Sequence, residues 1–176
     1  MFSSASSLSS DDDRWMQRAF QLAEEALEAN EVPVGCVFVF DNTEIGRGRN
    51  EVNETRDPTR HAEMVAIERM QLERADLAEV LNSSTLYVTL EPCIMCAAAL
   101  YQIGISKIVY GADNDRFGGM RSVGCAQKYH ADAESIEVVA GVESDRSIRI
   151  LKAFYDKQNP FAPPSKRKEK KSTDQA

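Results

Sequence analysis

The sequence predicts a layered α/β domain built around one mixed β-sheet. Four segments have helical patterns, and five shorter runs have the length of strands, the first of them a continuous apolar run with β-branched residues. The two patterns alternate along the chain, which is typical of α/β folds. A chain of 176 residues, 43% hydrophobic and 28% charged, has room for one domain with a sizeable core but hardly for two. No internal repeat is visible.

The first helix is expected to begin near Asp11 and to end near Asn30. Ser10 offers an N-cap, and the acidic run Asp11 to Asp13 suits the positive end of a helix. One apolar stripe at helical spacing follows, made of Met16, Ala19, Phe20, Ala23, Ala26 and Leu27.

A β-hairpin is expected next. The continuous apolar run Val32–Phe40 reads as a buried strand, and Asp41 and Asn42 supply a turn. Glu44–Asn50 would be its antiparallel partner.

The second half of the chain repeats the alternation. Pro58 and Thr59 precede a helical pattern whose first turn would hold His61 and Glu63. The strand Thr85–Leu90 leads through Pro92, where proline is tolerated, into a helix over Cys93–Ile103. The remaining expected elements are strands over Ile105–Gly111 and Ile136–Ala140 and an amphipathic helix over Arg146–Lys157, ended by Pro160, Pro163 and Pro164.

Composition divides the chain into three parts. Residues 1–10 are Ser-rich and expected to be disordered, residues 11–160 form the folded domain, and residues 161–176 form a basic tail. The chain carries a net charge of −7, but residues 160–176 alone carry +3, which leaves −10 for the rest. An acidic body has the wrong sign for holding a phosphate backbone, so a nucleic-acid substrate would need the tail or a partner subunit.

Targeting signals are not evident. No apolar run approaches the length of a membrane span, so no membrane association is expected. The segment Met1–Ser10 lacks the basic and apolar parts of a secretory signal and the arginines of a mitochondrial presequence. Four cysteines, two of them in a Cys-x-x-Cys pair, fit a reducing compartment, and we expect the cytoplasm and nucleus.

The most informative motif combines His61 and Glu63 with Cys93 and Cys96. One imidazole and two thiolates can hold Zn²⁺ and leave its fourth position open for water, as catalytic zinc sites do. The helix start is expected to lower the pKa of both thiols. Glu63 is not needed as a ligand, so it can move protons between water, a ring nitrogen and a departing amine. The pattern His-x-Glu followed by Pro-Cys-x-x-Cys resembles that of the zinc nucleobase deaminases.

A structural zinc site and a redox Cys-x-x-Cys are the alternatives. A structural site needs a fourth ligand, but Cys125 and His130 are expected in a separate loop, where we regard them as structural or incidental. A carboxylate next to the histidine ligand has no use in either alternative. The motif therefore favours a catalytic site.

Longer stretches resemble the tRNA-specific adenosine deaminases, and in particular the catalytic subunit of the eukaryotic heterodimeric enzyme. The matching segments are Glu31–Gly35, Gly48–Asn50, Arg60–Ile67, Thr89–Ala99, Arg116–Gly119 and the Lys/Arg-rich end. The resemblance implies a three-layer cytidine-deaminase-like fold with about five strands and helices on both faces. It also implies hydrolytic conversion of adenosine to inosine at wobble position 34 of tRNA anticodons, beside a related non-catalytic subunit.

Residue roles follow from the same resemblance. It implies that His61, Cys93 and Cys96 bind Zn²⁺, that Glu63 is the proton shuttle, and that Asn50 binds the flipped base. Further contacts would come from the backbone N–H of Ala62, the apolar wall of Val34, and tRNA-binding residues Tyr155, Lys166, Arg167, Lys168, Lys170 and Lys171. The alternatives are core packing for Val34 and Tyr155, a turn cap for Asn50, and a nuclear localisation run or solvated end for the tail.

Two other functions remain open at this point. A free nucleoside or nucleotide deaminase acting on cytosine or guanine would need the same zinc site. The spacing of Asn50, 11 residues before His61, and the basic tail argue against it. A non-enzymatic zinc protein serving as an assembly subunit would have no use for Glu63.

Overall fold

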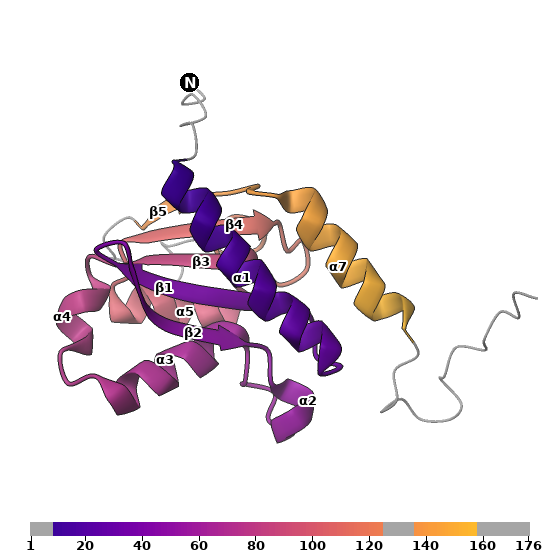
Figure 1. The fold of residues 1–176 in the computed structure, drawn as a ribbon, viewed down its shortest axis with the longest axis horizontal. Coiled ribbons are helices and arrows are strands. Elements are labelled where there is room, and N and C mark those ends of the chain that lie inside the picture. Colours follow the sequence, from indigo (N-terminus) through magenta and orange to yellow (C-terminus); the bar gives the residue numbers. More distant parts are fainter. Residues whose placement is uncertain (1–8, 125–135, 158–176) are drawn as a thin grey trace, which may run out of the picture.

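The computed structural model describes residues 9–124 and 136–157, and its helices cover both faces of one five-stranded sheet (Figure 1). The strands are β1 Gly35–Phe40, β2 Thr43–Arg49, β3 Thr85–Leu90, β4 Lys107–Ala112 and β5 Glu137–Val139. The helices are α1 Ser10–Glu28, α2 Val52–Thr55, α3 Ala62–Glu73, α4 Leu77–Leu81, α5 Ile94–Ile103 and α7 Ser144–Asp156.

The sheet is mixed, as predicted. Its order is β2-β1-β3-β4-β5; β1 is antiparallel to both of its neighbours, whereas β3, β4 and β5 run parallel. Helix α5 forms the connection between the parallel strands β3 and β4, which a hairpin turn cannot join. The carboxyl ends of β3 and β4 therefore meet at one edge of the sheet, the place where open α/β sheets bind ligands.

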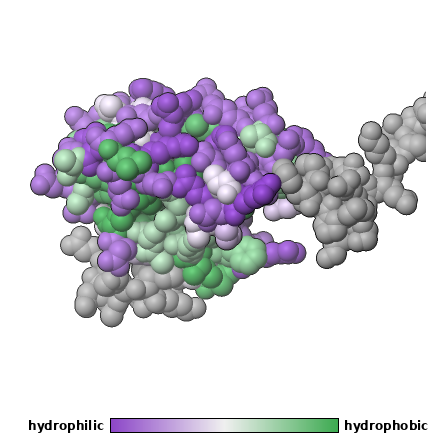
Figure 2. Space-filling model, turned by 90° about the horizontal axis from the view of Figure 1, so that it is seen from below, coloured by the Kyte–Doolittle hydropathy of each residue, from purple (hydrophilic) through white to green (hydrophobic). Residues whose placement is uncertain are grey.

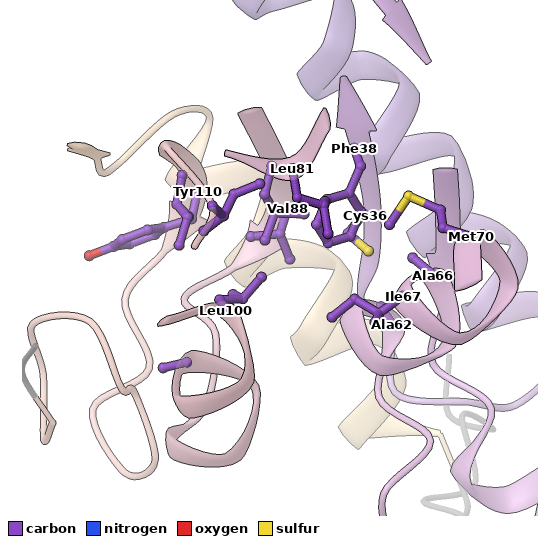
Figure 3. Packing of buried hydrophobic residues seen from close by; sticks show 14 of the residues in the cluster. Cys36, Phe38, Ala62, Ala66, Ile67, Met70, Leu81, Val88, Leu100 and Tyr110 are labelled. Carbon is purple, nitrogen blue, oxygen red and sulfur yellow. The ribbon is translucent and has the colours of Figure 1, made fainter. Parts of the chain in front are cut away.

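Alternation along the strands divides the core into two layers. In β1, Val37 and Val39 face α1, whereas Cys36 and Phe38 face the opposite layer. The same alternation in β3 and β4 places Tyr87 and Val109 in the α1 layer. Figure 3 shows the other layer, in which Ala62, Ala66, Ile67 and Met70 of α3 and Leu100 of α5 pack with Cys36, Phe38, Val88 and Tyr110 of the sheet. The predicted three-layer cytidine-deaminase-like arrangement is confirmed.

Helix α1 begins one residue earlier than expected. Its N-cap is Ser9 and not Ser10: the Ser9 hydroxyl accepts a hydrogen bond from the Asp12 amide, and the Asp12 carboxylate accepts one from the Ser9 amide. The capping box pairs Ser9 with Asp12, the acidic residue three positions later in the chain. The Asp12 carboxylate also accepts the Tyr87 hydroxyl at 2.7 Å, which ties the helix start to β3.

Strand β1 begins at Gly35, three residues later than predicted. Pro33 has no amide proton to donate to a ladder, and the Val34 amide bonds locally to the Val32 carbonyl, so this stretch leaves the sheet. The short helices α2 and α4 were not predicted, because four or five residues are too few to show a helical period. The bounds of β4, β5 and α7 differ from the prediction by one or two residues at each end.

Several sequence predictions fall outside the described residues. They concern residues 1–8 of the Ser-rich start, Cys125 and His130, the three prolines after α7, and the basic residues of the tail. Among the described helices, none combines the length and apolarity that crossing a bilayer requires.

Candidate active site

Two helix N-termini meet where the zinc ligands were predicted. His61 is the N-cap of α3 and Cys93 is the N-cap of α5, both with extended backbones. N-cap side chains usually accept a hydrogen bond from their own helix, but neither of these does so. Their side chains point to a shared position instead. Cys96, in the first turn of α5, joins them there.

The spacing of the three ligand atoms fits a zinc ion. The Nδ1 atom of His61 lies 3.4 Å from Sγ of Cys93 and 3.6 Å from Sγ of Cys96. All three ligand atoms lie within 4.8 Å of one another. Tetrahedral zinc, with bonds of about 2.3 Å to sulfur and 2.0 Å to nitrogen, would hold sulfur and nitrogen about 3.5 Å apart. The three residues thus suit Zn²⁺, with Nδ1 as the ligand atom of the imidazole.

The two cysteines do not titrate alike, contrary to the expectation that both thiols would be acidic. Hydrogen bonds with the Cys96 thiol and with His61 lower the pKa of Cys93 to about 4, although burial opposes them. The same hydrogen bond, together with burial, raises the pKa of Cys96. The hydrogen bond with Cys93 raises the pKa of His61. The three groups therefore share protons, which a metal must displace before it binds all three.

Glu63 lies in the first turn of α3, where its carboxyl group hydrogen-bonds with Cys96. Its residue is only 3% exposed, and burial raises the pKa of its carboxyl group, with the negative charge of Cys93 adding to the effect. A carboxyl group whose pKa is raised takes up a proton more readily than a free glutamate and can release it again later in a reaction. This is what a proton shuttle beside a zinc site requires.

A cavity of about 1060 Å³ opens above the trio. Its lining contains most of the described residues that the sequence singled out: Val34, Asn50, His61, Ala62, Glu63, Cys93 and Tyr155. The Asn50 amide donates to the Val34 carbonyl at 3.0 Å, which brings these two residues together. Tyr155 is 61% exposed, so it stands at the rim and not in the core. The basic tail residues lie outside the described part of the chain.

Comparison with known proteins supports the same assignment. The family model for the cytidine and deoxycytidylate deaminase zinc-binding region matches residues 9–112. The chain is 49% identical over 158 residues to tRNA-specific adenosine deaminase 2 of Danio rerio, a match that covers 86% of this chain and 74% of the relative. The chain belongs to the tRNA-specific adenosine deaminases of the cytidine and deoxycytidylate deaminase family.

Solved structures of other deaminases share the fold. A chain from studies of A-to-I editing by tRNA:A34 deaminases superimposes with a TM-score of 0.70 at 34% identity, covering 78% of this chain and 99% of the other. Guanine deaminase from Nitrosomonas europaea superimposes with a TM-score of 0.66 over 84% of this chain and 85% of the other, at 22% identity, which shows likeness of fold alone.

Sequence reasoning missed the role of Glu91 in this deaminase. Its residue is 1% exposed, and its carboxylate accepts the backbone amides of Asn114, Met120, Arg121 and Ser122 at 2.8–3.1 Å, and the Ser122 hydroxyl. A β-carbon on Gly118 would lie 2.2 Å from this carboxylate, so the loop needs glycine there.

The loop that Glu91 anchors supports the start of α5. The Phe117 carbonyl accepts the Ile94 amide, and the Gly119 amide donates to the Pro92 carbonyl, each at 2.8 Å. Residues 113–117 of the loop also line the cavity. A carboxylate within the apolar stretch before Cys93 was the available signal, since a buried charge must be paired. Glu31, which contacts Asn50, gave a similar signal that was also missed.

Proposed function

We propose that this chain hydrolyses the 6-amino group of adenosine at wobble position 34 of tRNA, giving inosine and ammonia. The observation that carries the proposal is the placement of Glu63 beside three atoms spaced for zinc, at the base of a cavity large enough for a nucleoside. The 49% identity to a protein named tRNA-specific adenosine deaminase 2 supports tRNA as the substrate. The structural likeness to a tRNA:A34 deaminase supports position 34.

The chemistry needs a nucleophile and a proton shuttle. Bound zinc would be held by His61, Cys93 and Cys96 and would supply the Lewis acidity that makes water nucleophilic at neutral pH. Glu63 would accept a proton from that water and deliver it first to the ring nitrogen and then to the leaving amine. The buried carboxyl group suits both transfers, because the desolvation that raises its pKa makes it hold a proton more readily than a free glutamate does.

Base binding falls to residues on the cavity wall. Asn50 would contact the edge of the adenine, which presents N7 as an acceptor and the 6-amino group as a donor. Val34 would pack on one side of the ring. The Ala62 amide belongs to the first turn of α3, where backbone N–H groups have no partner within the helix, so it would hold another edge of the base.

We also propose that the chain works beside a related, non-catalytic deaminase-like subunit. Helix α5 carries no charged residue, yet its first residue, Ile94, is 42% exposed. Phe117 and Val123, in the loop that borders α5, are also exposed. Apolar residues gather in part of the face seen in Figure 2. Exposed apolar surface of this kind suits a protein partner.

For tRNA contacts we propose the rim of the cavity and the basic tail. The exposed Tyr155 offers an aromatic face on which a splayed anticodon base can stack. Lys166–Lys168 with Lys170 and Lys171 provide the positive charge that the acidic body lacks. We propose the cytoplasm and nucleus as the location, since cysteines that must remain thiolates need a reducing compartment.

The test is an inosine assay with purified, zinc-loaded protein, alone and together with its candidate partner. The substrate is a tRNA that carries adenosine at position 34, and a matched tRNA with guanosine at 34, free adenosine, cytidine and guanine are the controls. Inosine formed in the first tRNA alone supports the proposal. Turnover of a free base or nucleoside at a comparable rate, with the tRNA untouched, would assign the site to a different deaminase.

The partner and tail have separate tests. Co-expression with the candidate partner should give a stable complex by analytical ultracentrifugation, and Ile94→Asp should weaken it because a charge would be buried. Deleting residues 165–171 should raise KM for tRNA and leave zinc content unchanged. An unaltered KM would remove the tail from the tRNA-binding surface.

A further inference from the structure

Glu31 is a fully buried carboxylate that the reaction does not use directly. It follows α1 in the chain, its residue is 0% exposed, and it faces the segment between β2 and α3. Its Oε2 atom accepts a hydrogen bond from Nδ2 of Asn50 at 3.0 Å and from the Asn53 amide at 3.1 Å. Its Oε1 atom accepts the Glu54 amide at 2.7 Å. All three partners are donors, as a buried carboxylate requires.

The contact with Asn50 removes an ambiguity. An amide side chain can present either its oxygen or its NH₂ group to a neighbour, but a carboxylate accepts hydrogen bonds and donates none. Only the NH₂ group of Asn50 can therefore face Glu31. The side-chain oxygen accepts no hydrogen bond from the described residues, so it and the second N–H stay available to a base in the cavity.

We propose that Glu31 is a positioning residue that fixes the amide orientation of Asn50 and so sets which hydrogen bonds the base-binding site offers. An amide held in this way presents an acceptor and a donor side by side, the pair that matches the 6-amino group and N7 of adenine. A flipped amide would present them in the wrong order. The inference rests on the proposed function, because it names how the same site recognises its base.

Substitutions at Glu31 separate orientation from burial. Glu31→Leu keeps a similar volume but offers no acceptor, so Asn50 is free to flip. Glu31→Gln retains one oxygen. Turning that oxygen toward Asn50 and Asn53 leaves one clash between donors, at Glu54, whereas the reverse orientation leaves two, so the glutamine should keep Asn50 in place.

The effect of amide orientation is measured by kinetics on tRNA with adenosine at position 34. The assay uses the zinc-loaded full chain with its partner subunit. Glu31→Leu should lower kcat/KM by about tenfold or more, the worth of a misplaced hydrogen-bond pair, and Glu31→Gln by no more than about threefold. In an Asn50→Ala background, Glu31→Leu should cost no more than about twofold, because the side chain it positions is gone. Glu54→Ala, which breaks an exposed ion pair of α2 with Arg49, is the matched control and should leave kcat/KM unchanged.

Three kinetic results would overturn the inference. They are a Glu31→Leu variant within twofold of the wild type, an equal loss with and without Asn50, and a Glu31→Gln variant as impaired as Glu31→Leu. The second result would mean that Glu31 supports the fold and does not act through Asn50.

Thermal unfolding tests the coupling without turnover, and it serves if Glu31→Leu does not fold. Asn50→Asp places two carboxylates together and should lower Tm by about 3 °C or more. Adding Glu31→Gln should restore at least half of that loss, since the introduced glutamine can donate to the introduced aspartate, which the native glutamate cannot do. No recovery would overturn the inference, whatever the kinetics show. If Tm recovers in the double variant but the wild-type protein makes no inosine, the proposed function is refuted and the coupling between Glu31 and Asn50 is left intact.

Discussion

Replacing Gly48 by alanine should damage the active site by displacing the start of α3, which contains Glu63. Gly48 lies in β2, where α3 crosses closely over the strand. A β-carbon there would lie 2.1 Å from the Ala62 carbonyl oxygen and 2.9 Å from the Ala66 amide nitrogen. These two atoms belong to the first two turns of α3, the part of the helix that follows His61 and contains Glu63.

The size of the displacement follows from these contacts. Real β-carbons do not approach other heavy atoms closer than 3.0 Å, so the helix start has to retreat by about 0.9 Å. A displacement of this size at the reacting groups lowers kcat/KM by about 100-fold. Overpacking should also lower the free energy of unfolding by about 1–3 kcal/mol.

A control on the same strand separates displacement of the helix backbone from the general cost of overpacking. A β-carbon on Gly46 would lie 2.3 Å from the side chain of Met70, a flexible group that can move without shifting the helix backbone. Gly46→Ala should therefore lose stability but keep kcat/KM within about threefold of the wild type. Inosine formation at saturating zinc measures the loss of kcat/KM, and unfolding in urea measures the loss of stability. A Gly48→Ala protein with wild-type turnover, or two variants with equal losses of activity, would refute the reasoning.

Three further outcomes are expected. Glu63→Gln should lower kcat by about 10²–10⁴-fold while zinc, measured by mass spectrometry, stays at one ion per chain; near-normal turnover would exclude Glu63 as the proton shuttle. Removing zinc with a chelator should abolish inosine formation and lower Tm, and added zinc should restore both, because the ion binds the folded site; activity that survives in metal-free protein would contradict this. Burial opposes ionisation of Asp12, but hydrogen bonds from Tyr87 and Ser9 outweigh it and lower the pKa of Asp12. The folded state therefore binds this proton less tightly than the unfolded state, and the stabilisation is present above pH 3.8 and lost as pH falls through the lowered pKa. Acid unfolding should depend less steeply on pH in Asp12→Asn, and parallel curves for the two proteins would show that Asp12 is not a source of the pH dependence.

The sheet was predictable because its evidence is local. The apolar runs that became β1, β3 and β4 are bounded by turn residues and have the length of strands. The errors have two sources. Val32 to Val34 looks like strand but leaves the ladder for a local reason, because Pro33 has no amide proton and the Val34 amide bonds to the Val32 carbonyl. Helix α2 depends on a distant contact, since Glu31, far from it in the chain, accepts two of its amides.

The active site was predictable to the extent that metal chemistry restricts residue types. An imidazole, two thiolates and a spare carboxylate have few other uses together, so His61, Glu63, Cys93 and Cys96 stand out from sequence alone. The carboxylates that support the site do not. Glu31 and Glu91 bind backbone amides and an amide side chain, partners that every sequence contains, and only the folded chain shows which of them are near.

The N-cap residues His61 and Cys93 form no capping hydrogen bond, and this affects the stability of the two helices that carry the site. Serine or aspartate at position 61 or 93 would supply the capping bond that histidine and cysteine withhold, a gain of about 1 kcal/mol for each helix. Bound zinc opposes this gain, because its binding to the folded site contributes more stability than a capping bond does. The uncapped helix starts are therefore a cost that the metal offsets, and they weaken the fold mainly when the metal is absent.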